Sequence, residues 1–365
     1  MRALVTGAPG FVGRHLVAHL EAAGDTIVPF ERAGTGVDVV EAEAVGEAVA
    51  ASRPDVVYHL AASTHIGESW DAPAAVFRVN AEGTLNVLQA CSRAGVDRVL
   101  VVGSADEYGA VSPDDLPITE EVPLRPRTPY GASKVAAEYL ALQAHLGDGL
   151  GTIRVRAFNH TGPGQAATYL VPGLAGRIVT AERDGARTIA VGSLDAVRDF
   201  SDVRDVVRAY RLLAEHGTDG DVYNVSSGRG WSVREVADAL LAASGADLEL
   251  RVDPALVRPV EVPALVGDAA KLRAATGWTP VRPFEDTLAE VPAPSVRAAL
   301  DPAEERGDGA GVVPESRAGG VDLVQLRARR GRVGERTGVL GRHDVVLRAV
   351  QDEQGPRREP LRRHS

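Results

Sequence analysis

The chain has 365 residues, enough for two domains, and its 44% hydrophobic and 25% charged residues are typical of a globular protein. Its net charge of −10 argues against a general nucleic-acid binder, which would need a basic face. The single cysteine, Cys91, excludes an intramolecular disulfide and a cysteine-rich metal site, and no metal centre is expected. No apolar run reaches the roughly 20 residues that span a bilayer, and a signal peptide has no room before the first glycines. We therefore expect a soluble, cytoplasmic protein without a membrane partner.

Short apolar runs alternate with stretches of helical length over residues 1–157. The predicted strands are Ala3–Thr6, Thr26–Phe30, Val56–Leu60, Val99–Val102 and Thr152–Arg156. The predicted helices include Val12–Ala23, Ala44–Ala51, Phe77–Ser92 and Ser133–His145. The strands are rich in Val and Leu and do not alternate with polar residues, as expected for parallel strands buried on both faces. The pattern predicts an α/β fold with a doubly wound parallel sheet.

A glycine loop follows the first predicted strand directly. It has the form Gly7-x-x-Gly10-x-x-Gly13, and Phe11 and Val12 begin the next helix. Glycines permit a tight turn, and the N–H groups at a helix N-terminus bind a pyrophosphate. The position of the loop between a strand and a helix makes the motif specific for a dinucleotide cofactor.

The end of the second strand bears on the choice of cofactor. Glu31 is placed to bind both ribose hydroxyls, which favours NAD, whereas the adjacent Arg32 can attract the 2′-phosphate of NADP. These two residues therefore do not decide between NAD and NADP. Asp38 and Val39 are placed to meet the adenine, where the carboxylate accepts a hydrogen bond from the exocyclic amine.

Tyr130 and Lys134 are four residues apart in a predicted helix. Only two of the 40 basic residues are lysines, so a lysine here indicates a need for a compact ammonium. Free tyrosine has a pKa of about 10, and an ammonium one helical turn away lowers it. Ser104 follows the strand Val99–Val102, at the sheet edge where ligands bind, and is placed to hold a substrate oxygen beside the phenol. The three side chains predict nicotinamide-dependent oxidation or reduction.

These residues resemble the extended short-chain dehydrogenase/reductase family, which acts largely on nucleotide-linked sugars. The resemblance covers roughly residues 1–290 and includes the segments His59-Leu60-Ala61-Ala62, Val79-Asn80-Ala81-Glu82-Gly83-Thr84 and Ser104-x-x-x-Tyr108-Gly109. It implies a Rossmann fold with NAD or NADP as cofactor. It also implies that Leu60, Ala61, Ala62 and Asn80 lie along the cofactor, as do Tyr130 and Lys134.

Three later segments resemble the GDP-mannose branch of that family. They are Phe158–Gln165, Arg198–Val203 and Arg258–Val262. By this resemblance the residues facing the nucleotide sugar are Asn159, Arg198, Arg258 and Glu261, together with Ser104, Asp106 and Glu107. Two arginines also suit a diphosphate physically, because a guanidinium binds phosphate oxygens through two hydrogen bonds.

The residues at two positions distinguish the reactions that members of this branch catalyse. Asp106 stands where dehydratases carry a longer Glu base, and Tyr169 stands where an epimerising reductase carries a His. The resemblance therefore implies reduction of the C4 keto group of a GDP-linked 4-keto-6-deoxy sugar, which gives GDP-6-deoxy-D-mannose (GDP-D-rhamnose). The alternatives are a GDP-mannose 4,6-dehydratase that uses Asp106 as its base, another nucleotide-sugar epimerase or dehydratase, and a non-catalytic Rossmann scaffold.

The domain organisation follows from the change in pattern along the chain. We expect a dinucleotide-binding domain over residues 1–157 and a substrate lobe over 158–291, from which about 187–216 return to the main sheet. No Phe, Trp or Tyr follows Phe284, so residues 292–365 are expected to be a low-order tail. Relatives pair the helices that correspond to Phe77–Ser92 and Ser133–His145, which implies a homodimer.

Overall fold

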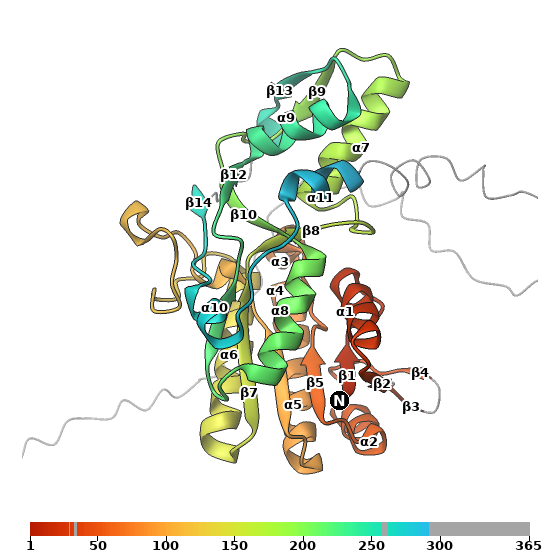
Figure 1. Ribbon diagram of the computed structural model, residues 1–365, viewed down its shortest axis with the longest axis vertical. Helices are drawn as coiled ribbons and strands as arrows, with labels where there is room; N and C mark the ends of the chain where they lie inside the picture. Colours follow the sequence, from red (N-terminus) through yellow and green to blue (C-terminus); the bar gives the residue numbers. More distant parts are fainter. Residues whose placement is uncertain (29, 33–34, 257–261, 292–365) are drawn as a thin grey trace, which may run out of the picture. The chain divides into compact units, whose positions relative to one another are not determined.

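Six parallel strands form the central sheet of the computed structural model, which describes residues 1–28, 30–32, 35–256 and 262–291 (Figure 1). In spatial order they are β11 (Val222–Val225), β7 (Gly151–Ala157), β6 (Arg98–Val102), β5 (Val56–His59), β1 (Arg2–Thr6) and β2 (Thr26–Val28). The chain passes from β1 to β2, which pairs with one edge of β1, and then crosses to β5, which pairs with the opposite edge of β1. This reversal is the switch point at which doubly wound sheets bind ligands. The predicted fold class is confirmed.

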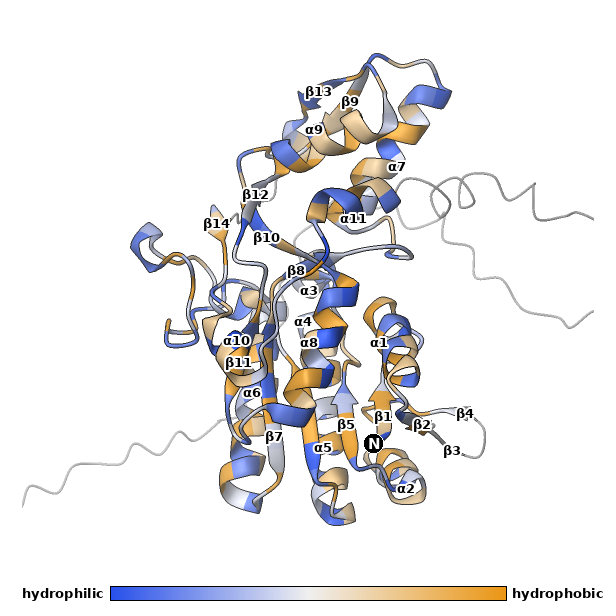
Figure 2. Cartoon of the chain, in the orientation of Figure 1, coloured by the Kyte–Doolittle hydropathy of each residue, from blue (hydrophilic) through white to orange (hydrophobic). Residues whose placement is uncertain are grey.

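Helices cover both faces of this sheet because its strands send apolar side chains to both sides. In β1, Ala3 and Val5 belong to one apolar cluster and Leu4 to the other, and Figure 2 draws this strand as hydrophobic. The first cluster is covered by α1 (Phe11–Ala22), α8 (Val203–His216) and α10 (Ala270–Thr276). The second is covered by α2 (Ala42–Ser52), α5 (Gly83–Ala94) and α6 (Pro129–Asp148).

A smaller lobe is built from segments of the second half of the chain. Its strands are β8 (Asn159–Thr161), β9 (Thr188–Val191), β10 (Val197–Asp202), β12 (Gly230–Ser232), β13 (Glu249–Val252) and β14 (Ala264–Leu265). Its helices are α7 (Leu170–Arg183), α9 (Val233–Ser244) and α11 (Phe284–Glu290). The rings of Phe200 and Trp231 pack on Phe284, each with ring centroids 5.2 Å from it, and anchor α11 in this core.

The lobe assignment from sequence needs two corrections. The strand β9, expected to return to the main sheet, pairs with β13 instead. The strand β11, expected in the lobe, is the sixth strand of the main sheet and pairs with β7. The helix α8 does pack against α1 on the main sheet. A short apolar strand does not encode its partner, because pairing depends on the path of the chain between the strands.

The remaining elements are short. They are β3 (Glu31–Arg32), β4 (Thr35–Gly36), α3 (Ile66–Asp71), α4 (Pro73–Phe77), the π-helical turn η1 (Arg78–Glu82), and the 3₁₀ turns η2 (Ala105–Glu107), η3 (Pro113–Asp115) and η4 (Pro254–Leu256). The described residues belong to one compact unit. The predicted tail, 292–365, lies outside the described residues. Within the described ranges no helix is both long and apolar enough to cross a membrane.

Candidate active site

The glycine loop lies at the carboxyl end of β1, beside the switch point. Gly7 has a φ of +73°, and a Cβ atom there would lie 2.9 Å from the backbone of the loop after β5. A Cβ atom on Gly13 would lie 2.2 Å from the Gly7 carbonyl oxygen, so α1 packs directly on the loop. Gly10 is the N-cap of α1, Phe11 and Val12 open its first turn, and no side chain caps this helix end. The loop and the uncapped helix end therefore fit a dinucleotide pyrophosphate.

The segment after β2 holds the residues predicted to meet the adenosine. Glu31 and Arg32 form β3, which pairs with β4. Asp38 is exposed at the surface. Val39 is buried, and a Cβ atom on Gly83 of α5 would lie 2.7 Å from its side chain. The Val39 side chain therefore packs in the core, and the contact of this residue with the adenine stays a prediction.

Asn80 supports the loop after β5 from behind. Residues 60–62 of this loop are partly buried, and the Ala61 N–H donates to Thr6 Oγ1 at 3.2 Å. Asn80 is 1% exposed, accepts from the Ser63 N–H at 2.7 Å, and donates to Ser133 Oγ at 2.9 Å. Its amide therefore forms hydrogen bonds with other groups of the protein. Asn80 therefore holds the loop against α6, and its place along the cofactor stays a prediction.

Ser104, Tyr130 and Lys134 come together at the carboxyl end of β6. Tyr130 and Lys134 lie one turn apart in α6, whose N-cap Thr128 accepts from the Gly131 N–H at 2.9 Å. The Lys134 ammonium donates to the Val102 carbonyl at 2.8 Å. All three predicted catalytic side chains are buried, with exposures between 6% and 8%. The helix and the strand end therefore hold the phenol, the ammonium and the hydroxyl in one place.

Burial sets the protonation states in this cluster. It raises the pKa of Tyr130 well above the ordinary value, and the negative charge of Asp106 adds to the effect, whereas a hydrogen bond with Ser104 opposes it. Burial also lowers the pKa of Lys134 to about 8. At neutral pH the phenol therefore holds its proton and the ammonium holds its charge.

Asp106 and Glu107, both predicted to contact the substrate, lie differently. Asp106 accepts a hydrogen bond from the Ser104 hydroxyl at 3.3 Å, so its carboxylate adjoins the catalytic cluster. Glu107 is 0% exposed, and its carboxyl accepts from the Ser104 N–H at 2.6 Å. The prediction for Glu107 is therefore wrong, because the side chain is enclosed by protein on the inner side of Ser104.

The predicted sugar-binding residues come from two paired strands of the lobe. Asn159 is exposed in β8, and its register partner in β10 is Phe200, two residues after Arg198. The structure thus brings Asn159 and Arg198 to neighbouring strands. Arg258 and Glu261 lie outside the described residues.

Tyr169 adjoins the cluster but was not among the predicted site residues. Its hydroxyl is 2.7 Å from Thr64 Oγ1, its ring packs against His65, and it lies close enough to Tyr130 to interact with it electrostatically. The only sequence signal was its position where an epimerising relative has a His. Contact with the residues after β5 depends on the lobe, which the sequence does not place.

Side chains from the first turns of α1 contact β8 and the loop that follows it. Phe11 stacks on His160 with ring centroids 6.4 Å apart. His15 Nε2 and Arg14 Nη2 lie 3.0 and 3.2 Å from carbonyl oxygens of the segment 162–165. Side chains from the cofactor half and the lobe therefore join next to the glycine loop.

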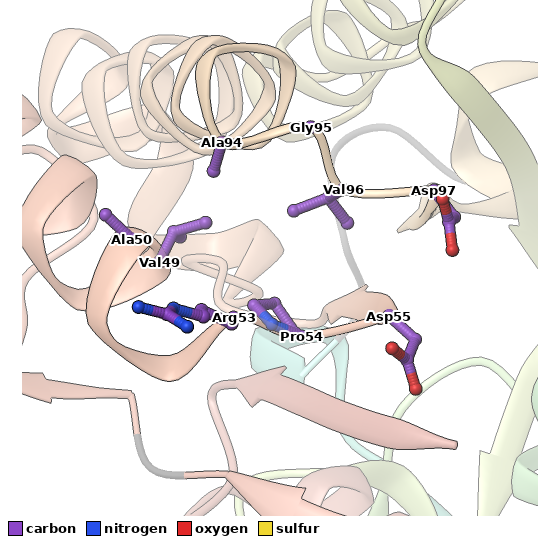
Figure 3. Close-up of a pocket in the computed structure, with 9 residues that line it drawn as sticks. All are labelled: Val49, Ala50, Arg53, Pro54, Asp55, Ala94, Gly95, Val96 and Asp97. Carbon is purple, nitrogen blue, oxygen red and sulfur yellow. The ribbon is translucent and has the colours of Figure 1, made fainter.

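Two hollows lie away from this cluster. One, of about 350 Å³, lies between the ends of α2 and α5 at the amino ends of β5 and β6, and Figure 3 shows its lining. This is the sheet edge opposite the glycine loop. The other, of about 830 Å³, is lined by α7, β9 and the segment 164–167. The described part of the chain has no group of three or more His, Cys, Asp or Glu side chains placed to hold a metal ion.

The chain is similar in sequence to enzymes that act on nucleotide sugars. Residues 33–291 match the family described as GDP-mannose 4,6 dehydratase. A GDP-6-deoxy-D-mannose reductase from Pseudomonas aeruginosa is 38% identical over 291 residues, which cover 79% of this chain and 94% of the relative. A UDP-glucose 4-epimerase from Azospirillum brasilense is 32% identical over 312 residues, with coverage of 76% and 87%.

Solved structures support the same relationship. The structure of RMD from Pseudomonas aeruginosa complexed with NADPH has a TM-score of 0.74 at 38% identity, and the match covers 80% of this chain and 97% of that one. The UDP-glucose 4-epimerase of Thermus thermophilus in complex with NAD has a TM-score of 0.72 at 31% identity, with coverage of 82% and 100%.

Proposed function

The chain belongs to the GDP-mannose 4,6-dehydratase family of NAD(P)-dependent nucleotide-sugar enzymes, and from this premise we propose which reaction it performs. It reduces the C4 keto group of a GDP-linked 4-keto-6-deoxy sugar, giving GDP-6-deoxy-D-mannose (GDP-D-rhamnose). The observation that carries the proposal is the cluster of Ser104, Tyr130 and Lys134 beside the glycine loop. A phenol that holds its proton at neutral pH suits a reduction, in which a proton must be given to the sugar oxygen.

Each side chain of the cluster has a distinct role in this proposal. A bound NADH or NADPH supplies the hydride. Tyr130 donates its proton to the C4 oxygen, and Ser104 donates a hydrogen bond that orients this oxygen. Lys134 stabilises the phenolate that remains, because its ammonium carries positive charge one helical turn away. The backbone carbonyl of Val102 holds the ammonium in place.

Residues of the lobe account for the nucleotide half of the substrate. Asn159 and Arg198 lie on neighbouring strands, and a guanidinium suits the diphosphate. We assign Arg258 and Glu261 to the same site on the basis of sequence resemblance alone. The relative with 38% identity, a GDP-6-deoxy-D-mannose reductase, supports guanosine as the base.

The proposal is tested with a panel of 4-keto-6-deoxy sugars linked to GDP, UDP and dTDP. Oxidation of NADH and of NADPH is followed by the loss of their absorbance, and the sugar product is identified by NMR. We expect the GDP-linked substrate to give the highest kcat/KM and a product with the D-manno configuration. No oxidation with any of these sugars would refute the assignment.

A dehydratase is the second candidate, favoured by the contact of Asp106 with the Ser104 hydroxyl. This contact places a carboxylate beside the cluster, where a dehydratase needs a base. The measurement that separates the two reactions is incubation with GDP-mannose and the oxidised cofactor. Accumulation of a 4-keto sugar would favour the dehydratase, and unchanged GDP-mannose favours the reductase.

An unpartnered apolar surface on α4 and α6 supports a homodimer. Phe77, Tyr139 and Leu146 are 50%, 57% and 74% exposed, although α4 and α6 pack together. Large apolar side chains gathered on one surface mark an interface, and helices of this kind pair into a four-helix bundle. We expect light scattering to give the mass of a dimer, and Tyr139→Glu to shift it to that of a monomer.

A matched substitution controls for the introduction of charge on an apolar surface. Val281, 67% exposed and outside α4 and α6, is replaced by Glu, and this variant is expected to stay dimeric. A monomeric wild-type protein at micromolar concentration would contradict the prediction.

A further inference from the structure

The Glu107 carboxyl is buried directly beneath Ser104. Glu107 is the last residue of η2 and is 0% exposed. Its Oε1 accepts from the Ser104 N–H at 2.6 Å, while the Asp106 N–H donates back to Ser104 Oγ at 3.2 Å. These two hydrogen bonds fix the conformation of the turn, as a capping box does at the start of a helix.

The backbone before Ser104 is shaped to admit this carboxyl. A Cβ atom on Gly103 would lie 2.3 Å from Glu107 Oε1 and 2.8 Å from the Val155 carbonyl oxygen. Any other residue at position 103 would push the carboxyl away from the Ser104 N–H. The glycine and the glutamate thus form one unit at the end of β6.

A buried ion pair lies near the carboxyl, on the side of α6. Glu138 of α6 accepts from Arg156 Nη2 at 2.7 Å and from Arg154 Nη1 at 3.1 Å. Burial raises the pKa of Glu107 well above its ordinary value, and the negative charge of Glu138 raises it further. The other titratable groups that act on this region are Tyr130 and Lys134 of α6 and Asp106 of η2. Burial and Glu138 therefore both favour the protonated form of the Glu107 carboxyl.

We propose that Glu107 is a positioning residue that holds Ser104 in its reactive orientation from inside the protein. The proposal rests on the proposed function, because it requires that Ser104 orients the substrate oxygen. Ser104 has a hydroxyl that must point at the same atom as Tyr130. Its backbone lies between β6 and η2, where its N–H donates to the Glu107 carboxyl and its carbonyl oxygen accepts from the Glu107 N–H at 3.1 Å.

Two substitutions of similar size separate this role from simple packing. Glutamine keeps an acceptor of the same length, because its carbonyl oxygen accepts from the Ser104 N–H. Leucine fills the space but leaves the buried Ser104 N–H without an acceptor. We expect Glu107→Gln to keep kcat within about twofold of the wild type, and Glu107→Leu to lower kcat about 10-fold to 100-fold.

The experiment measures kcat, KM for the GDP-linked keto sugar, the pH profile and the Kd for NADPH in all three proteins. Hydrogen exchange of the Ser104 amide is the readout that does not depend on activity. We expect faster exchange in Glu107→Leu only, NADPH affinity within about twofold throughout, and the same pH profile for Glu107→Gln and the wild type. A loss in Glu107→Gln as large as in Glu107→Leu would overturn the proposal, as would a wild-type kcat in Glu107→Leu.

Two further variants keep the result interpretable. If Glu107→Leu does not fold, Gly103→Ala tests the same contact from the other side, and an unchanged kcat and Ser104 exchange rate there would overturn the proposal. Ser104→Ala tests the proposed function separately. If Ser104→Ala is fully active, the proposed function fails. If Ser104→Ala is inactive while Glu107→Leu equals the wild type, only the positioning role fails.

Discussion

Replacing Tyr130 by phenylalanine is expected to lower kcat by about 100-fold or more while NADPH still binds. The variant lacks only the phenolic oxygen, and the ring keeps its place at the start of α6, where it is 7% exposed. The protein then has no group in this position to give a proton to the sugar oxygen. Steady-state kinetics with the keto sugar measure the loss, and fluorescence of bound NADPH measures its Kd.

The same helix supplies the control for this variant. Tyr139→Phe removes a phenolic oxygen from an exposed side chain of α6 and is expected to keep the wild-type kcat. Near-normal turnover in Tyr130→Phe would refute the proton-donor role.

Lys134→Arg is the second substitution with a large expected effect, a loss of about 10-fold or more in kcat. The ammonium is 6% exposed and donates to the Val102 carbonyl at 2.8 Å, in a space enclosed by β6 and α6. A planar guanidinium is larger and cannot occupy the same position relative to the phenol. Positive charge alone therefore does not restore the function of this lysine.

The pH dependence offers an independent check on Lys134. Burial lowers the pKa of its ammonium to about 8, so its charge is present below this pH and is lost as the pH rises through it. We expect the wild-type kcat/KM for reduction to fall above about pH 8. In Lys134→Arg the residual activity should lack this decline, because a guanidinium stays charged.

The other lysine of the chain provides the matched control. Lys271 forms an ion pair with Asp221 at 2.9 Å and is partly exposed, so Lys271→Arg is expected to behave as the wild type. Wild-type rates in Lys134→Arg as well would show that the requirement for an ammonium is mistaken.

Local chemistry explains why much of the site was predictable from the sequence alone. Gly7, Gly10 and Gly13 are spaced for a turn of fixed geometry. The sequence places this turn between a strand and a helix. Tyr130 and Lys134 are one helical turn apart, so their proximity follows from the helix itself. Ser104 follows the end of a parallel strand, and such ends meet at one edge of the sheet. The homology that these motifs indicate was then found over most of the chain.

Only the tertiary structure could decide which way individual side chains point and which strands pair. Glu107 was predicted to contact the substrate, but its carboxyl turns inwards to the Ser104 N–H and the space beside Gly103. Asn80 lies in a π-helical turn that directs its amide to Ser63 rather than outwards. The strand β11 joins the main sheet through contacts that are distant in sequence. These outcomes depend on the sum of many long-range packing contacts, whereas the motifs depend on a few neighbouring residues.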